Sequence, residues 1–199
     1  LSLVGSEMCI RDRYGSEKYD FCLRETQTYE IIEDVAQMKS EIGILYLNDF
    51  NRKAMQKIFA ENDLEFTELF QCDVYVYLSN HHPLAGRDKI TFEELGDYPC
   101  LSFEQGDKNS FYFAEEVFST LQYKQMIKAD DRATMLNLMV GMNGYTLCSG
   151  IICEELNGDG YSAIPLETDE KMTIGYIKRK GMHISHIGKS YIEILRGYA

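Results

Sequence analysis

The sequence predicts an α/β fold with mixed, mainly parallel sheets. From Tyr14 onward, short strand patterns alternate with helical patterns, and no internal repeat is visible. Residues 42–47 form a continuous apolar run, which is typical of a strand buried on both faces of a parallel sheet. Alternation of this kind indicates strands joined by helical crossovers. A chain of 199 residues is long enough to bury one core or two small ones.

The N-terminal half contains three strand patterns and two helix patterns. Thr28 can cap the first helix, because its hydroxyl can accept an N–H of the first turn and apolar residues follow at helical spacing. Asn51 opens the second helix, in which apolar residues also follow at helical spacing. The strands are expected at residues 19–24, 42–47 and 73–78.

The C-terminal half alternates in the same manner. Thr91 and Glu94 fit a capping box for one short helical turn. Longer helices are expected from Ser110 to about Leu121, from Arg132 to Met142 with Asp131 as the N-cap and Gly144 as the stop, and after Ser185. We expect strands at residues 100–103, 125–129, 145–148, 161–164 and 172–177.

Composition excludes several classes of protein. The formal net charge of −12 disfavours nucleic-acid binding by this polypeptide itself, because phosphate contacts need clustered Lys and Arg. No apolar run approaches the ~20 residues of a membrane span, so no membrane partner is expected. The chain begins with Leu1, and residues 1–13 resemble a translated sequencing adapter. We expect residues 1–13 to be an artefactual tail.

Motifs of catalysis and cofactor binding are missing. The sequence contains no GxxxxGK[ST], no GxGxxG after a strand, no HExxH and no GxSxG. We therefore expect no catalytic residues, no metal site and no cofactor.

A small-molecule site is predicted from topology. In open α/β sheets, ligands bind beyond the carboxyl ends of strands, where helix N-termini offer N–H groups to carboxylates and other polar ligands. Arg132 is the basic candidate there. The alternative for Thr28 and Asp131 is a capping role alone, worth about 1 kcal/mol each. The candidate ligand-binding residues are Thr26, Gln27, Thr28, Asn48, Ser102, Phe103, Asp131, Arg132, Ala133 and Thr134.

Three stretches carry a resemblance to a known family. Residues 23–45, residues 78–102 (with "HPLAG" at 82–86) and residues 140–145 ("VGMNGY") occur in the order and spacing of the effector-binding domain of LysR-type transcriptional regulators. The resemblance covers nearly everything after Tyr14. The resemblance implies effector contacts by Ser or Thr at two of the predicted positions, residues 26–28 and residues 131–134.

The resemblance implies a two-lobed type II periplasmic-binding-protein-like fold with two crossover strands and a small-molecule effector bound between the lobes. Lobe I would comprise residues 14–78 with 173–199 and would be incomplete, and lobe II would comprise residues 79–172. It also implies a cytoplasmic, non-enzymatic regulator that works as a homodimer or tetramer and contacts DNA only through an N-terminal winged helix missing from this sequence.

Two other functions share this scaffold. A solute-binding protein of a transporter would need a signal peptide or lipid anchor. An enzyme would need a poised acid–base pair, whereas the candidate residues are mostly hydroxyls and amides.

Overall fold

The computed structural model describes residues 22–106, 110–151 and 159–198. The predicted tail at residues 1–13 and the first half of the predicted strand at residues 19–24 lie outside these ranges, and its second half, residues 22–24, is loop. The described chain divides into two compact units, one of residues 2–71 with 173–199 (lobe I) and one of residues 72–172 (lobe II). The first division falls after Gln71, seven residues before the predicted position, because the strand that begins at Tyr75 pairs within lobe II.

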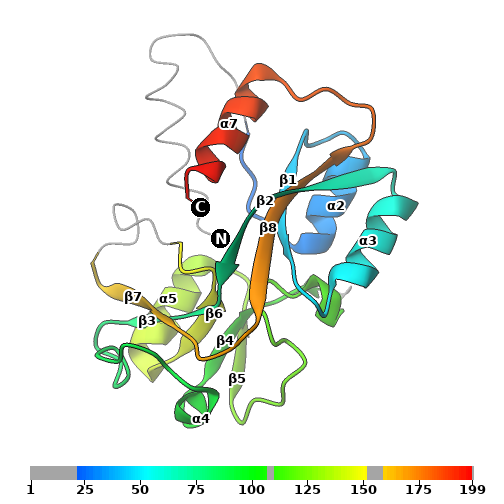
Figure 1. The fold of residues 1–199 in the computed structure, drawn as a ribbon. Helices are drawn as coiled ribbons and strands as arrows, with labels where there is room; N and C mark the ends of the chain where they lie inside the picture. The colour runs from blue at the N-terminus through cyan, green and yellow to red at the C-terminus, as the bar shows by residue number, and fades with distance from the viewer. Residues whose placement is uncertain (1–21, 107–109, 152–158, 199) are drawn as a thin grey trace. The chain divides into compact units, whose positions relative to one another are not determined.

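Lobe I is a three-stranded sheet with helices on both faces (Figure 1). The strand order is β1-β8-β2, and β1 runs antiparallel to β8. The long strand β2 was not predicted, since charged residues interrupt its apolar pattern. The elements are α2 (Thr28–Ala36), β1 (Gly43–Leu47), α3 (Arg52–Glu61), β2 (Leu64–Asp73), β8 (Lys171–Arg179) and α7 (His186–Arg196).

Alternation along β1 explains why this sheet has two covered faces. Gly43 lies directly beside Ile31 of α2, so a Cβ at Gly43 would be 2.4 Å from the Ile31 side chain. Ile44, one position along, packs instead against Tyr191 of α7. Successive strand residues point to opposite faces, so α2 and α7 cover opposite sides of β1.

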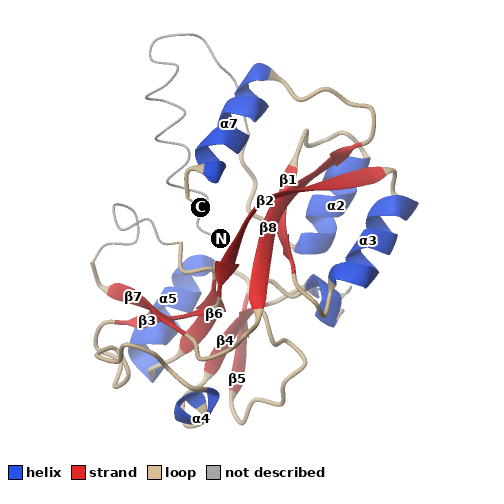
Figure 2. Ribbon diagram, in the orientation of Figure 1, coloured by secondary structure: helices blue, strands red, loops and turns tan. Residues whose placement is uncertain are grey.

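Lobe II contains a five-stranded sheet in the order β5-β4-β6-β3-β7 (Figure 2). β4 is parallel to β5 and β6, whereas β3 is antiparallel to β6 and β7. The sheets are thus mixed, as predicted, but the expectation of mainly parallel sheets is not met, because antiparallel pairs outnumber parallel ones among the strand pairings given for the described residues. The elements are β3 (Tyr75–Ser79), α4 (Phe92–Leu95), β4 (Cys100–Phe103), η2 (Phe111–Phe113), β5 (Met126–Ala129), α5 (Arg132–Met142), β6 (Tyr145–Cys148) and β7 (Tyr161–Pro165).

The core of lobe II forms where α5 packs on the sheet. Leu101 of β4 is fully buried against Met135 and Met139 of α5. The helix ends at Asn143, which adopts the left-handed conformation with φ 50°. The prediction that Gly144 stops the helix is wrong. Gly144 is needed for a different reason, because a Cβ there would lie 2.8 Å from the Leu101 side chain.

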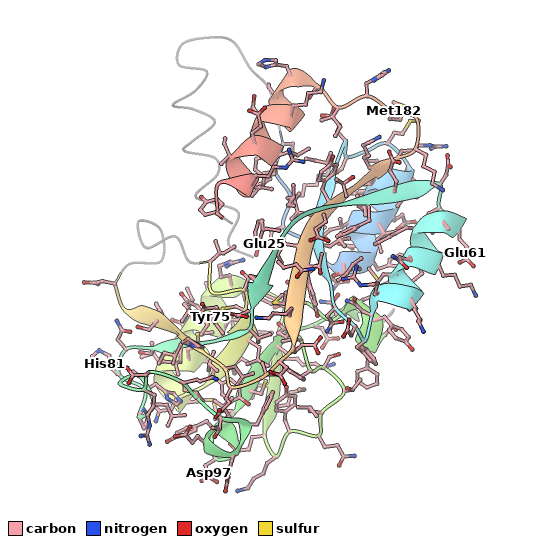
Figure 3. The ribbon with its side chains drawn as sticks, in the orientation of Figure 1. Glu25, Glu61, Tyr75, His81, Asp97 and Met182 are labelled. Carbon is pink, nitrogen blue, oxygen red and sulfur yellow. The ribbon has the colours of Figure 1, made fainter. Side chains whose placement is uncertain are left out.

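The predicted helix from Ser110 to Leu121 does not form. Only one 3₁₀ turn, η2, follows Ser110, and Phe118 takes a positive φ of 61°. Glu116, in the middle of this segment, is buried and hydrogen-bonded to β4, so tertiary contacts replace the helical ones. The formal charge sits mostly on the outside, as Glu61 and Asp97 illustrate (Figure 3).

Candidate functional site

Four of the predicted residues lie at one end of lobe I. Thr26, Gln27 and Thr28 precede or begin α2, and Asn48 follows β1. Because the end of α2 packs beside the start of β1, the N-terminus of α2 lies toward the carboxyl end of that strand. The structure therefore brings these four residues to the same end of one α/β layer.

Two kinds of local hydrogen bond involve these lobe I residues, one between uncharged groups and one to a carboxylate. Asn48 and Asn51 exchange two hydrogen bonds of 2.9 Å, each backbone N–H donating to the other side-chain oxygen, and both residues are buried. The Thr26 hydroxyl donates to the Glu30 carboxylate. The prediction that Thr28 caps α2 is wrong: Thr28 is the first helical residue, and the capping position belongs to Gln27, whose side chain makes no capping hydrogen bond.

Six further candidates gather at one edge of the lobe II sheet. β4 and β5 are parallel neighbours, with Ser102 opposite Lys128 and Phe103 opposite Ala129, so both strands end at the same edge. Only two residues separate the end of β5 from the start of the helix α5. The structure thus brings Ser102 and Phe103 together with Asp131, Arg132, Ala133 and Thr134.

Asp131 caps α5, as predicted. Its carboxylate accepts a 2.8 Å hydrogen bond from the Thr134 backbone N–H. Hydrogen bonds from the Thr134 hydroxyl and backbone, together with one from the Ala133 N–H, hold the pKa of Asp131 below its usual value. Arg132 begins the helix, and its positive charge acts on the Tyr77 hydroxyl of β3.

Glu116 is the main residue that the sequence analysis missed. Its two carboxylate oxygens accept hydrogen bonds of 3.0 Å, one from the Ser102 hydroxyl and one from the Phe103 backbone N–H. Burial raises its pKa to about 7, because the charged form is poorly solvated. No sequence signal links Glu116 to β4, since it lies 14 positions beyond Ser102 in an irregular segment.

Tyr77 was also missed. Its ring packs against Tyr161 with centroids 5.5 Å apart, and its buried hydroxyl has no hydrogen-bond partner among the described residues. Burial raises the pKa of Tyr77 to about 12, so the hydroxyl stays protonated and can donate a hydrogen bond. Tyr77 is part of a strand pattern with other tyrosine and apolar residues, so the sequence does not distinguish it from a tyrosine of the core.

Lobe I also contains a cavity of about 650 Å³. It lies at the sheet edge formed by β1, between residues of α2 and α7. Its apolar lining includes Leu23, Ile31, Ile42, Ile44 and Tyr191.

Metal and membrane chemistry find no support in the described ranges. There, no group of three or more His, Cys, Asp or Glu side chains is arranged to hold a metal ion. Nor is any helix in those ranges long and apolar enough to cross a membrane.

Comparison with known proteins finds a relative that is named as a transcriptional activator. The malolactic fermentation system transcriptional activator of Lactococcus lactis subsp. lactis (strain IL1403) is 27% identical over 137 residues, which is 67% of this chain and 46% of the activator. The chain therefore spans about half the length of that relative.

Two solved structures have the same fold. The effector-binding domain of QuiR in complex with shikimate has a TM-score of 0.64 at 18% identity, covering 99% of this chain and 90% of that one. The BenM effector-binding domain with benzoate has a TM-score of 0.62 at 18% identity, covering 98% and 86%. The two-lobed, periplasmic-binding-protein-like α/β fold predicted from the sequence is thereby confirmed. Residues 18–199 match the LysR substrate binding domain, and the chain belongs to that family.

Proposed function

We propose that this chain is the effector-sensing domain of a LysR-type transcriptional regulator. The observation that carries the proposal is the family match over residues 18–199 together with the gathering of polar candidates at one sheet edge in each lobe. The family match does not favour a transporter's solute-binding protein. A role in regulation without catalysis, in the cytoplasm, accompanies this proposal.

The ligand that suits these residues is a small polar molecule with an anionic group. Hydroxyls, amides and helix N-termini bind carboxylates, and Arg132 adds a positive charge. QuiR and BenM are named with shikimate and benzoate, which are both small carboxylates. An effector that binds one conformation more tightly shifts the population toward it. That shift would rearrange the lobes and the pairing of subunits in a dimer or tetramer, with DNA contacted by a separate winged helix.

We also propose that lobe I takes up a further strand. In the described part of lobe I, β1 pairs only with β8, and the cavity of about 650 Å³ opens beside its other edge. A strand added there would supply hydrogen bonds to β1 and fill the apolar space between α2 and α7.

The effector proposal is tested by ligand binding to matched variants. Shikimate, benzoate and other small carboxylates are screened by thermal shift, and hits are measured by calorimetry. We expect Thr28→Ala and Thr134→Ala each to weaken binding about tenfold, the effect of losing a hydrogen bond to a charged group. Thr91→Ala is the control, because it removes the capping box of α4 away from the candidate residues.

The opposite result would contradict the assignment of Thr28 and Thr134 to the binding site. If Thr28→Ala and Thr134→Ala lower stability as Thr91→Ala does and leave affinity unchanged, these residues only support their helices. Reading the gene upstream of the Tyr14 codon separates the two functional classes, since a helix-turn-helix would support a regulator and a signal sequence would support a transporter protein.

A further inference from the structure

The carboxylate of Glu116 is held by the end of β4. The Ser102 hydroxyl and the Phe103 N–H each donate to a different oxygen of this carboxylate at 3.0 Å. Glu116 is 7% exposed, so water contributes little to its solvation. Burial raises the pKa of Glu116, and against this larger effect the two donors and the Glu116 backbone N–H favour the charged form and lower it.

The donor pair is of the kind that binds a free carboxylate. A backbone N–H and a hydroxyl that point to two different oxygens fix both the position and the orientation of the group. Both donors belong to adjacent residues on a strand, and β4 is held between β5 and β6. The backbone of Ser102 and Phe103 is therefore held by its pairing with Lys128 and Ala129 of β5, independently of Glu116.

The neighbouring side chain also points to a built polar site. Gln105, two residues after β4, is 4% exposed. Its Nε2 donates to the Glu115 carboxylate at 3.3 Å, and its Oε1 has no hydrogen-bond partner among the described residues. A buried acceptor, the Gln105 side-chain oxygen, thus lies in the segment that follows the two donors.

We propose that Ser102 and Phe103 form a carboxylate-binding site in lobe II that is occupied by the chain's own Glu116. Glu116 is then an internal competitor, and a carboxylate ligand reaches these donors only by displacing it. The link to an effector rests on the function proposed above, whereas the occupied site does not depend on that function.

Acetate is the probe for the site. Glu116→Ala removes a CH₂ and a carboxylate, and acetate restores the same heavy atoms. We expect 100 mM sodium acetate to raise the Tm of the Glu116→Ala chain by about 3 °C relative to sodium chloride at equal ionic strength. The wild-type chain and the Glu115→Ala control should show no such difference, because their site is filled.

Amide NMR locates the binding. In Glu116→Ala, the Phe103 amide resonance should shift saturably with acetate, and in the wild type it should not move. A folded Glu116→Ala chain whose Phe103 resonance ignores acetate would overturn the proposal. A wild-type chain that binds acetate at Phe103 as well as the variant does would overturn it too.

The wild type provides a second test if Glu116→Ala does not fold. The Phe103 amide and the Glu116 side-chain carboxyl carbon should titrate with one common midpoint, and Glu116→Gln should abolish the titration of Phe103. Separate midpoints would refute the contact. If acetate binds Glu116→Ala and no effector candidate binds the wild type, the effector function fails and the carboxylate site stands.

Discussion

The polar groups at the ends of the strands are hydrogen-bonded in different ways in the two lobes. In lobe I, Asn48 and Asn51 exchange uncharged hydrogen bonds across three positions in the sequence. In lobe II, the corresponding end of the sheet is held by carboxylates, Asp131 on the N-terminus of α5 and Glu116 on the end of β4. The lobe I arrangement is local and has no charge to lose, whereas the lobe II arrangement depends on protonation and on a long-range contact.

The largest expected difference between the lobes is a pH dependence of stability that comes from lobe II. The pKa of Glu116 rises from 4.5 to about 7 on folding. Between these values the folded chain holds a proton that the unfolded chain has lost, so stability falls as the pH rises from 4.5 to 7. The loss amounts to about 3 kcal/mol and is complete above pH 7.

Urea unfolding at several pH values measures this slope, and Glu116→Gln should remove the fall in stability, leaving the opposite contribution of His82, whose pKa is lowered by burial. Cys100 and Tyr123 also interact with Glu116, but burial raises the pKa of Cys100 to about 12 and raises that of Tyr123 as well, so neither titrates in this range. Glu115, the adjacent carboxylate that also acts on Glu116, is the matched control. If the pH dependence survives in Glu116→Gln and disappears in Glu115→Gln, it comes from Glu115 and the prediction is wrong.

The second effect belongs to lobe I and should not vary with pH. Asn51→Ala removes the side-chain oxygen that accepts from Asn48 and so leaves the buried backbone N–H of Asn48 unpaired, while the hydrogen bond from the backbone N–H of residue 51 to Asn48 is kept. We expect a loss of about 2 kcal/mol in the free energy of unfolding. Asn51→Asp keeps the side-chain oxygen that accepts from Asn48 and should lose less at neutral pH. Equal losses in the two variants would mean that packing, not the hydrogen bond, holds this turn.

The smallest effect compares the two helix N-termini directly. Asp131→Ala should destabilise the chain by about 1 kcal/mol, because it removes the cap of α5. Gln27→Ala should change little, since the Gln27 side chain makes no capping hydrogen bond to α2. Gln27→Asp should add a cap and stabilise lobe I by about 0.5 kcal/mol. Thermal melts of the three variants suffice, and a cost for Gln27→Ala equal to that of Asp131→Ala would remove the distinction.

The features predicted from sequence were those encoded within a few residues. Capping at Thr91, Asp131 and Ser185 is confirmed, because each side chain accepts an N–H three positions ahead. The strand at residues 42–47 is found as Gly43–Leu47, since a continuous apolar run suits burial on both faces. The gathering of Ser102 with Asp131 followed from strand topology alone.

The features that sequence could not predict depend on distant partners. The segment after Ser110 has a helical pattern, yet burial of Glu116 against β4 pulls it out of the helix. Asn143 rather than Gly144 takes the left-handed conformation, and the glycine is required instead by the close approach of Leu101, a contact with a distant strand. The effector contacts themselves remain predictions, as does the incompleteness of lobe I.

Among the described residues β1 pairs on one side only, and this has a practical consequence for handling the protein. Edge strands avoid pairing with other molecules through charged residues, prolines or coverage. The other three outer strands carry such protection, Glu65 and Glu68 in β2, Lys128 in β5 and Pro165 in β7. β1, with the sequence GILYL, has neither charge nor proline. Concentrated preparations should therefore lose material through strand-to-strand association of lobe I, and a lysine in β1 should extend their shelf life.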